Sequence, residues 1–155
     1  MLTALYKILE ERYSHCQLVV GMDANCYFDA KNGARLGVQD FGKWLADHGW
    51  QSCFGTTPDT AKVTTCTART FLQPQMNKVN LAAERATNGD VNPKDHILFL
   101  NPDVHTRGCR LVGEAGRDNT GSGDFKSDVT FPTLMFPSDH AIICAVLELE
   151  SKQSN

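Results

Sequence analysis

The sequence predicts an α/β (α+β) fold in which a mixed β-sheet is flanked by helices. Two segments carry apolar residues at helical spacing, and shorter apolar runs have the length and composition of strands. Helical and strand segments alternate irregularly, which is typical of this class. The 155 residues fit one domain, residues 1–150, with a short polar tail at 151–155. Hydrophobic residues make up 41% of the chain, which is enough for a packed core.

The two expected helices differ in how clearly their ends are marked. The first covers residues 2–13, where large apolar side chains recur with a helical period. The second presents an apolar face formed by Val38, Phe41 and Leu45. Gly49 follows this face and is a natural C-terminal stop.

Five strands are expected, each a short apolar or threonine- and valine-rich run bounded by turn residues. In chain order they are 18–20 (ending near Met22), a strand within 62–72, 95–100, 109–115 and 141–149. The apolar run Ala141–Leu147 is typical of a buried core strand. The connection 73–94 fits a short helix at 78–86, and the glycine-rich stretch 116–128 is expected to be a mobile loop.

Composition restricts the class of protein. The net charge is −3 and the isoelectric point about 5.9, which argues against a broad non-specific nucleic-acid binder. The six cysteines show no CxxC spacing, so we expect buried reduced thiols rather than a zinc knuckle. No segment has the length of a membrane span or the pattern of a signal peptide. We therefore expect a soluble intracellular protein of the cytoplasm or nucleus.

Polar residues stand at the ends of three predicted strands. Asp23 and Asn25 follow the first strand, Asp95 opens the strand 95–100, and Asp139 and His140 open the last one. Strand ends can converge in space although they lie far apart in sequence. Magnesium needs only one or two carboxylates beside substrate phosphate oxygens, and an Asp–His pair supplies an oriented imidazole. This pattern predicts a phosphoester hydrolase with Mg²⁺ as cofactor and Mn²⁺ as an alternative.

A rival interpretation makes Ser138, Asp139 and His140 an acyl-transfer triad. Neighbouring residues on a strand point to opposite faces, so adjacent residues are poorly placed for a proton relay. The chain also has no GxSxG nucleophile elbow. His96 alternates away from Asp95 on its strand, and we expect it to be structural.

Four motifs resemble the endonuclease/exonuclease/phosphatase superfamily. "GMDAN" is similar to its GDxN signature, "KDHILF" to its Asp-led strand, and "PSDHAII" to its closing SDH motif. "TTCTART" stands where many members have a Thr-x-Arg strand, and the motifs follow the family's order over residues 17–149. The resemblance implies metal-dependent phosphoester hydrolysis. It also implies the C-terminal half of a two-sheet, four-layer α/β sandwich.

The resemblance assigns roles to individual residues. It implies that Asp23 orients or deprotonates the attacking water and that Asn25 holds the water or a phosphate oxygen. His140 would contact the scissile phosphate, and Asp95 would accept the other N–H of the imidazole. Metal ligation would fall to Asp139, with Asp23 and Asn25.

The substrate expected from the resemblance is a phosphodiester or phosphomonoester, with nucleic acid favoured. Residues 61–94 hold five cationic against two acidic residues, which suits a polyanionic strand. A solvated surface connection would explain this charge equally well. Thr67, Arg69 and Lys94 are the candidate substrate-binding residues.

One departure from the family pattern leaves alternatives open. The resemblance implies an upstream half that carries a metal-binding glutamate, and Glu10 and Glu11 lie in a helix rather than at a strand end. We expect an N-terminal half to be missing, which would leave an apolar sheet face in water and an isolated chain that is poorly soluble or inactive. The alternatives are a degenerate, non-catalytic binding domain and a phosphatase of small phosphorylated molecules or lipids.

Overall fold

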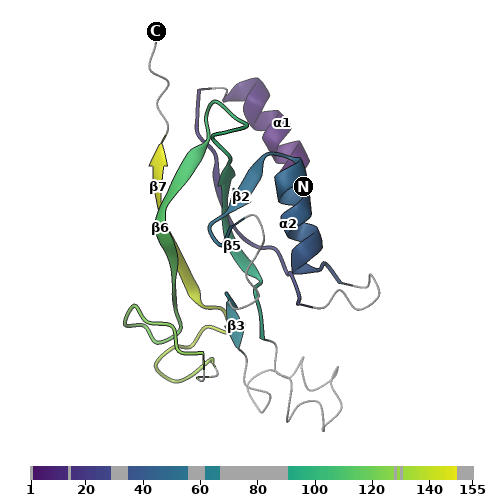
Figure 1. The fold of residues 1–155 in the computed structure, drawn as a ribbon. Helices are drawn as coiled ribbons and strands as arrows, with labels where there is room; N and C mark the ends of the chain where they lie inside the picture. Colours follow the sequence, from purple (N-terminus) through teal and green to yellow (C-terminus); the bar gives the residue numbers. More distant parts are fainter. Residues whose placement is uncertain are drawn as a thin grey trace.

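The computed structural model describes residues 2–13, 15–28, 35–55, 62–66, 91–127, 129 and 131–149, and these form helices and small antiparallel sheets. Figure 1 shows the arrangement. The helices are α1 (Leu2–Arg12) and α2 (Val38–Asp47). The strands are β1 (Val19–Asp23), β2 (Trp50–Ser52), β3 (Thr65–Cys66), β4 (Val91–Asn92), β5 (Asp95–Leu100), β6 (Cys109–Asp118) and β7 (Ile142–Leu149).

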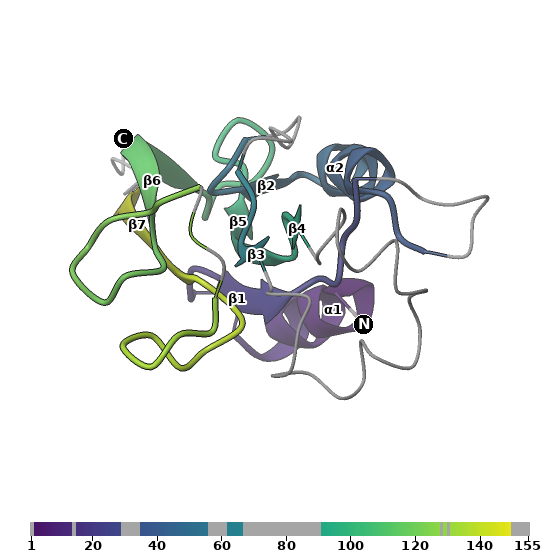
Figure 2. The ribbon, with the colours of Figure 1, turned by 90° about the horizontal axis from the view of Figure 1, so that it is seen from below.

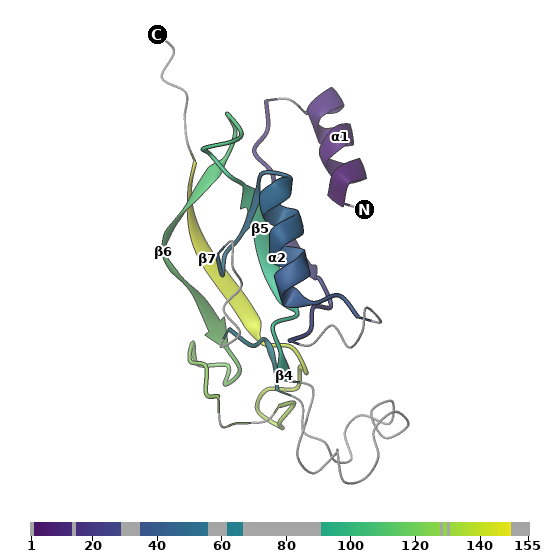
Figure 3. The same ribbon diagram turned by 45° about the vertical axis from the view of Figure 1, so that its right-hand side comes forward.

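Three layers stack on one another in this part of the chain. The hairpin-like pair β6–β7 lies on one face of the sheet β1–β5–β2, and both helices lie on the other face (Figures 1 and 3). Seen from below, α1 lies toward β1 and α2 toward β2 (Figure 2). β5 supplies both cores by alternation, because Leu98 and Leu100 pack on the helix side while Phe99 packs toward β6–β7.

The expected mixed sheet is wrong for the described residues, since every strand pair there is antiparallel. β1, α2 and β2 follow one another and would give parallel neighbours if β1 and β2 paired directly. Instead β5 lies between them and pairs antiparallel with both. Leu98, Phe99 and Leu100 are at most 1% exposed, so the strand that must be buried on both faces takes the central position.

The second helix begins and ends close to the predicted positions. Phe41 and Leu45 are buried on its inner face, and the backbone turns away at Gly49 with φ +70°. The Gly49 N–H donates to the carbonyl of Ala46 at 3.1 Å, and the chain then enters β2. The first helix is also confirmed, with Tyr6 packed edge-on against Trp50 of the core.

The last strand forms as expected, as β7 starting at Ile142, but burial of the whole run Ala141–Leu147 was a wrong prediction. Ile143 and Leu147 face β5 and are partly buried, whereas Ile142, Cys144 and Val146 are exposed on the outer face of β6–β7. No described element covers that outer face (Figure 1). An apolar run does not reveal whether one or both faces of a strand are covered, and here one is.

The stretch 116–128, expected to be a loop, begins inside β6, which extends to Asp118. The turn that follows is tied to the Asp118 carboxylate by the main-chain N–H groups of Thr120, Gly121 and Gly123, at 2.7 to 2.9 Å. These hydrogen bonds, led by the one from Thr120, lower the pKa of Asp118 to about 2. The polar composition therefore marks a turn organised by one carboxylate.

All six cysteines are free, as expected, but the expectation that they are buried is wrong for two of them. Four of them, Cys26, Cys53, Cys66 and Cys109, are buried, and Cys16 and Cys144 are exposed. The strand expected within 62–72 appears as β3, and its remainder lies outside the described residues, as do the predicted helix at 78–86 and the tail 151–155. Neither helix described is long and apolar enough to cross a bilayer.

Candidate active site

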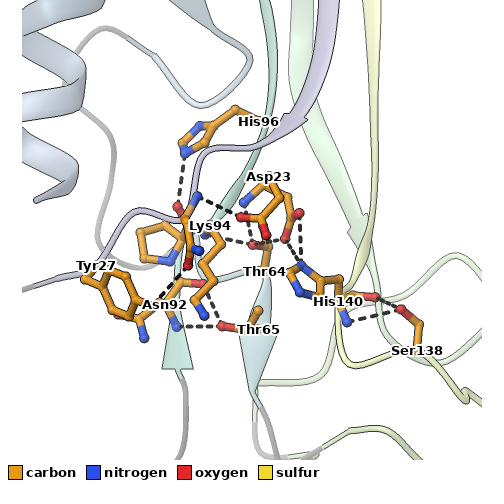
Figure 4. A network of polar contacts seen from close by, with 12 residues as sticks. Asp23, Tyr27, Thr64, Thr65, Asn92, Lys94, His96, Ser138 and His140 are labelled. Carbon is orange, nitrogen blue, oxygen red and sulfur yellow. Dashed lines mark hydrogen bonds and ion pairs between the residues drawn. The ribbon is translucent and has the colours of Figure 1, made fainter. Parts of the chain in front are cut away.

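Three of the predicted site residues meet at one end of the sheets. Asp23 is the last residue of β1 and lies directly opposite Asp95, the first residue of β5. Cross-strand partners share a face, and this face is turned toward β6–β7. His140 stands just before β7 on that side, and candidate ligand atoms of the three residues lie within 4.8 Å of one another. The structure thus brings together residues separated by more than a hundred positions (Figure 4).

The histidine and one aspartate form a close pair. His140 Nδ1 lies 2.8 Å from Oδ2 and 3.0 Å from Oδ1 of Asp95. An ionised carboxylate can only accept, so Nδ1 carries the proton and donates it. This fixes the ring orientation and leaves Nε2 as the nitrogen that can meet a ligand. The His140 side chain is 33% exposed and that of Asp95 15%, so the pair opens to solvent on the histidine side.

Thr64 anchors this pair, and sequence reasoning did not single it out. Its hydroxyl donates to Asp95 Oδ2 at 2.7 Å and accepts the main-chain N–H groups of Lys94 and Asp95 at 3.0 and 2.9 Å. Its carbonyl accepts the N–H of Ala141 at 2.8 Å, which ties down the entry to β7. Thr64 is fully buried. The available signal was a threonine at the start of a predicted strand, which alone has no distinctive meaning.

The other side of the group is built by a tight turn after β1. Asn25 has φ +52°, and its N–H donates to Asp23 Oδ1 at 2.7 Å. Tyr27 donates its hydroxyl proton to the side-chain oxygen of Asn25 at 3.0 Å. Asparagine tolerates this left-handed conformation better than most residues, and here its main-chain N–H orients the Asp23 carboxylate while its side-chain oxygen orients the Tyr27 ring. Asn25 therefore lies beside Asp23, and its role toward water or phosphate stays a prediction.

The three residues of the SDH segment make different contributions to the site. Ser138 donates its hydroxyl proton to the carbonyl of His140 at 2.8 Å and accepts the His140 N–H at 3.1 Å. The serine is thus bonded to the main chain, and the imidazole pairs with Asp95, so the structure gives no relay for an acyl-transfer triad. Asp139 is half-buried and lies outside the group of three, within the residues described. Its role as a metal ligand stays a prediction.

His96 is structural, as its position in the strand predicted. It is fully buried on the helix face, beside Phe41 at a ring-centroid distance of 5.1 Å. Nε2 lies 3.0 Å from the carbonyl of Pro93 and must donate, so Nδ1 accepts from the Ser52 hydroxyl at 2.9 Å. Burial lowers the pKa of His96 below its ordinary value of 6.5. The neutral ring is therefore the form that fits.

Of the three predicted substrate-binding residues, only Lys94 lies within the described part of the chain. Lys94 is buried, at 8% exposure, and its ammonium lies over the Tyr27 ring, 4.9 Å from the centroid. Thr67 and Arg69 lie outside the described residues. The Glu10 carboxylate accepts a hydrogen bond from the Tyr6 hydroxyl at 2.6 Å. This contact holds the Glu10 side chain against α1, and Glu10 lies outside the group of three.

The donor set fits a hard divalent cation. Asp23 and Asp95 offer carboxylate oxygens, the donors preferred by Mg²⁺ and Mn²⁺. Each carboxylate has about four acceptor positions, so the hydrogen bonds from Asn25, Thr64 and His140 leave some of them open. Two carboxylates directly opposite each other repel, which destabilises the folded chain. A cation bound between them would offset this repulsion.

A scan against protein-family models, a search of curated proteins and a search of solved structures each found no match.

Proposed function

We propose that this protein is a metal-dependent phosphoester hydrolase, of the phosphodiesterase type found among nucleases. The observation that carries the proposal is the convergence of Asp23, Asp95 and His140 within 4.8 Å, with the imidazole oriented by a carboxylate. Phosphoester hydrolysis needs an oriented water, a donor to the phosphate oxygens and a means of offsetting charge. Asp23 can orient the water, His140 can donate to a phosphate oxygen, and Asp23 and Asp95 can hold a cation that offsets the charge.

Each residue has a definite part in this proposal. Asp23 is exposed and holds one oxygen to the Asn25 N–H, so its other oxygen is available to accept a proton from the attacking water. His140 directs Nε2 toward the phosphate, and Asp95 keeps the proton on Nδ1. Asp23 and Asp95 would hold the cation, with Asp139 added by the motif resemblance. When bound, the cation supplies charge compensation for the phosphate and acidifies water.

We also propose that the fold is part of a two-sheet, four-layer α/β sandwich. The superfamily that the motifs resemble is built on two packed sheets with helices outside. In this chain β6–β7 packs on β1–β5–β2, one side of that pair carries helices, and the outer face of β6–β7 carries apolar side chains such as Val146. This supports the proposal that the chain corresponds to part of a four-layer α/β sandwich.

The test is hydrolysis by the purified chain. The substrates are bis-p-nitrophenyl phosphate and a labelled single-stranded oligonucleotide, each with Mg²⁺, Mn²⁺ or EDTA. We expect metal-dependent cleavage that falls on the order of 10²- to 10⁴-fold in His140→Ala and Asp95→Asn, the range for loss of acid–base catalysis. The double variant should be little worse than either single one, because the two side chains act as a unit.

Two variants control for non-specific loss. His15→Ala and Asp124→Asn remove an exposed imidazole and an exposed carboxylate that lie outside the group of three. Both should retain wild-type activity. A chain that melts cooperatively but shows no metal-dependent cleavage would contradict the proposal, as would cleavage that survives His140→Ala.

A further inference from the structure

A hydrogen bond joins the side chains of Tyr27 and Asn25 at the turn that follows β1. The Tyr27 hydroxyl donates to Oδ1 of Asn25 at 3.0 Å. The main-chain N–H of Asn25 donates to Oδ1 of Asp23 at 2.7 Å, so the asparagine borders the candidate active site. Tyr27 therefore reaches that site through one intervening residue.

The rest of the chain holds the Tyr27 ring in place. Its main-chain N–H donates to the carbonyl of Leu36, and its carbonyl accepts the N–H of Val38, each at 2.9 Å. The residue is half-buried, and the Arg35 guanidinium carbon and the Lys94 ammonium lie 4.5 Å and 4.9 Å from the ring centroid. The hydroxyl therefore projects from a ring whose position is fixed by two other segments of the chain.

The hydrogen bond from Tyr27 decides which end of the Asn25 amide remains available. A primary amide that turns over exchanges its acceptor oxygen for its nitrogen, which carries two donor protons. The donated hydroxyl proton holds the oxygen against Tyr27. Among the residues that the structure describes, no hydrogen bond occupies Nδ2 of Asn25, and this residue is exposed. The nitrogen is therefore the group that a ligand can meet.

We propose that Tyr27 is a positioning residue of the hydrolase, because its hydroxyl orients the Asn25 amide so that Nδ2 donates to an oxygen of the substrate phosphate. This inference rests on the proposed hydrolase function and adds to it a residue that the motifs do not include. Nδ2 can only donate, and a negatively charged phosphate oxygen is the strongest acceptor that a phosphoester brings to it. With the amide turned over, Oδ1 would face that oxygen and repel it.

A double-mutant cycle tests whether Tyr27 acts through Asn25. Tyr27→Phe removes the hydroxyl and keeps the ring, and kcat/KM for bis-p-nitrophenyl phosphate should fall about 2- to 10-fold, the range for loss of one hydrogen bond. Asn25→Gly removes the amide and keeps the main-chain N–H, in a residue that tolerates the φ of +52°. It should lose about 100-fold, the effect of removing a side-chain donor to a developing charge. Adding Tyr27→Phe to Asn25→Gly should cause no further loss, because the hydroxyl then has no amide to orient.

Tyr13→Phe is the matched control, since it removes the hydroxyl of an exposed tyrosine that directly follows α1. Its kcat/KM should equal that of the wild type. A Tyr27→Phe enzyme with wild-type kcat/KM would overturn the proposal. So would a Tyr27→Phe change that costs the same factor with and without Asn25→Gly, because a merely structural role of the hydroxyl predicts that result.

Phosphate binding gives a second measurement that does not depend on turnover. In heteronuclear NMR spectra the Nδ2–H signals of Asn25 are identified by their loss in Asn25→Gly, and inorganic phosphate is added with Mg²⁺ present. These signals should shift in the wild type and in Tyr13→Phe, and clearly less in Tyr27→Phe. If they do so in a protein that cleaves nothing, the hydrolase proposal fails and the orientation of Asn25 by Tyr27 stands. Signals that ignore phosphate, or that respond equally in Tyr27→Phe, would refute the role of Tyr27 whatever the activity.

Discussion

Adjacent residues of β5 have opposite environments, and this difference organises the candidate site. Asp95 faces β6–β7 and accepts a hydrogen bond from His140 Nδ1, whereas His96 faces the helices and is buried beside Phe41. The environments differ because successive side chains along a strand point to opposite faces of the sheet. A carboxylate needs partners or water, and Asp95 has Thr64 and His140, while a neutral imidazole can be buried once both nitrogens are bonded.

The burial of His96 gives a pH dependence of stability. Its pKa in the folded chain lies below the unfolded value of 6.5, so both states bind no proton above that pH. As pH falls below 6.5 the unfolded chain binds a proton that the folded ring resists, and the free energy of unfolding decreases until the folded pKa is reached. Urea denaturation at pH 7.5 and pH 5.5 measures this loss.

The comparison is with His96→Gln and with His15→Gln at an exposed position. We expect His96→Gln to be less stable at pH 7.5, since it cannot reproduce both hydrogen bonds, but to lose less stability on acidification. His15→Gln should lose as much as the wild type. An equal acid-induced loss in all three proteins would show that His96 does not contribute to the pH dependence.

At the scale of elements, the end of α2 sets the direction of the chain into β2. Gly49 has φ +70°, and its carbonyl accepts the N–H of Asn101 at 2.8 Å, which joins this turn to the end of β5. A Cβ at this position would meet the side chains of His105 and Val104. Both the conformation and the space therefore require glycine here.

Gly113 provides a matched comparison for this position. It has nearly the same φ, +72°, but nothing lies within 4 Å of where its Cβ would be. We expect Gly113→Ala to lower the free energy of unfolding by about 1 kcal/mol and Gly49→Ala by about 2 to 4 kcal/mol, because only the latter adds a steric clash to the strained backbone. Chemical denaturation measures both. Equal losses would mean that the neighbours of Gly49 move aside without cost.

At the scale of the molecule, the candidate site joins three segments of the chain that belong to two packed layers. Asp23 and Asp95 belong to the central sheet, and His140 leads into the outer pair β6–β7. A cation bound at this site would stabilise the folded state through binding. The outer face of β6–β7 leaves the apolar side chains of Val112 and Val146 exposed.

Cation binding should therefore be visible in thermal unfolding. At about 100 times Kd, Mg²⁺ or Mn²⁺ should raise the free energy of unfolding by about 2.7 kcal/mol in the wild type. Asp23→Asn should lose this increase. Without metal, Asp23→Asn should be the more stable protein by about 0.2 to 1 kcal/mol, since it removes a like charge opposite Asp95.

The control is Asp124→Asn, whose exposed carboxylate lies outside the group of three. Differential scanning fluorimetry with and without metal covers all three proteins. An equal metal-induced shift in the wild type and Asp23→Asn would place the cation elsewhere.

The sequence by itself determined the local features of this protein. Helical spacing located α1 and α2, Gly49 marked the end of α2, and the apolar runs located β5, β6 and β7. Polar residues at strand ends pointed to Asp23, Asp95 and His140, and alternation along the strand separated His96 from Asp95. All these features depend on neighbours within a few residues, where periodicity and backbone preferences act.

Only the tertiary structure decided how those segments meet. It inserted β5 between β1 and β2, exposed one face of β7, placed Thr64 under Asp95, and set Arg35 and Lys94 around Tyr27. Thr64 and Asp95 are 31 positions apart, and their hydrogen bond depends on how two sheets are packed and in what register. Local preferences carry no information about such distant pairing. It is fixed when the chain buries β5 on both faces, and the contacts between distant residues follow from that burial.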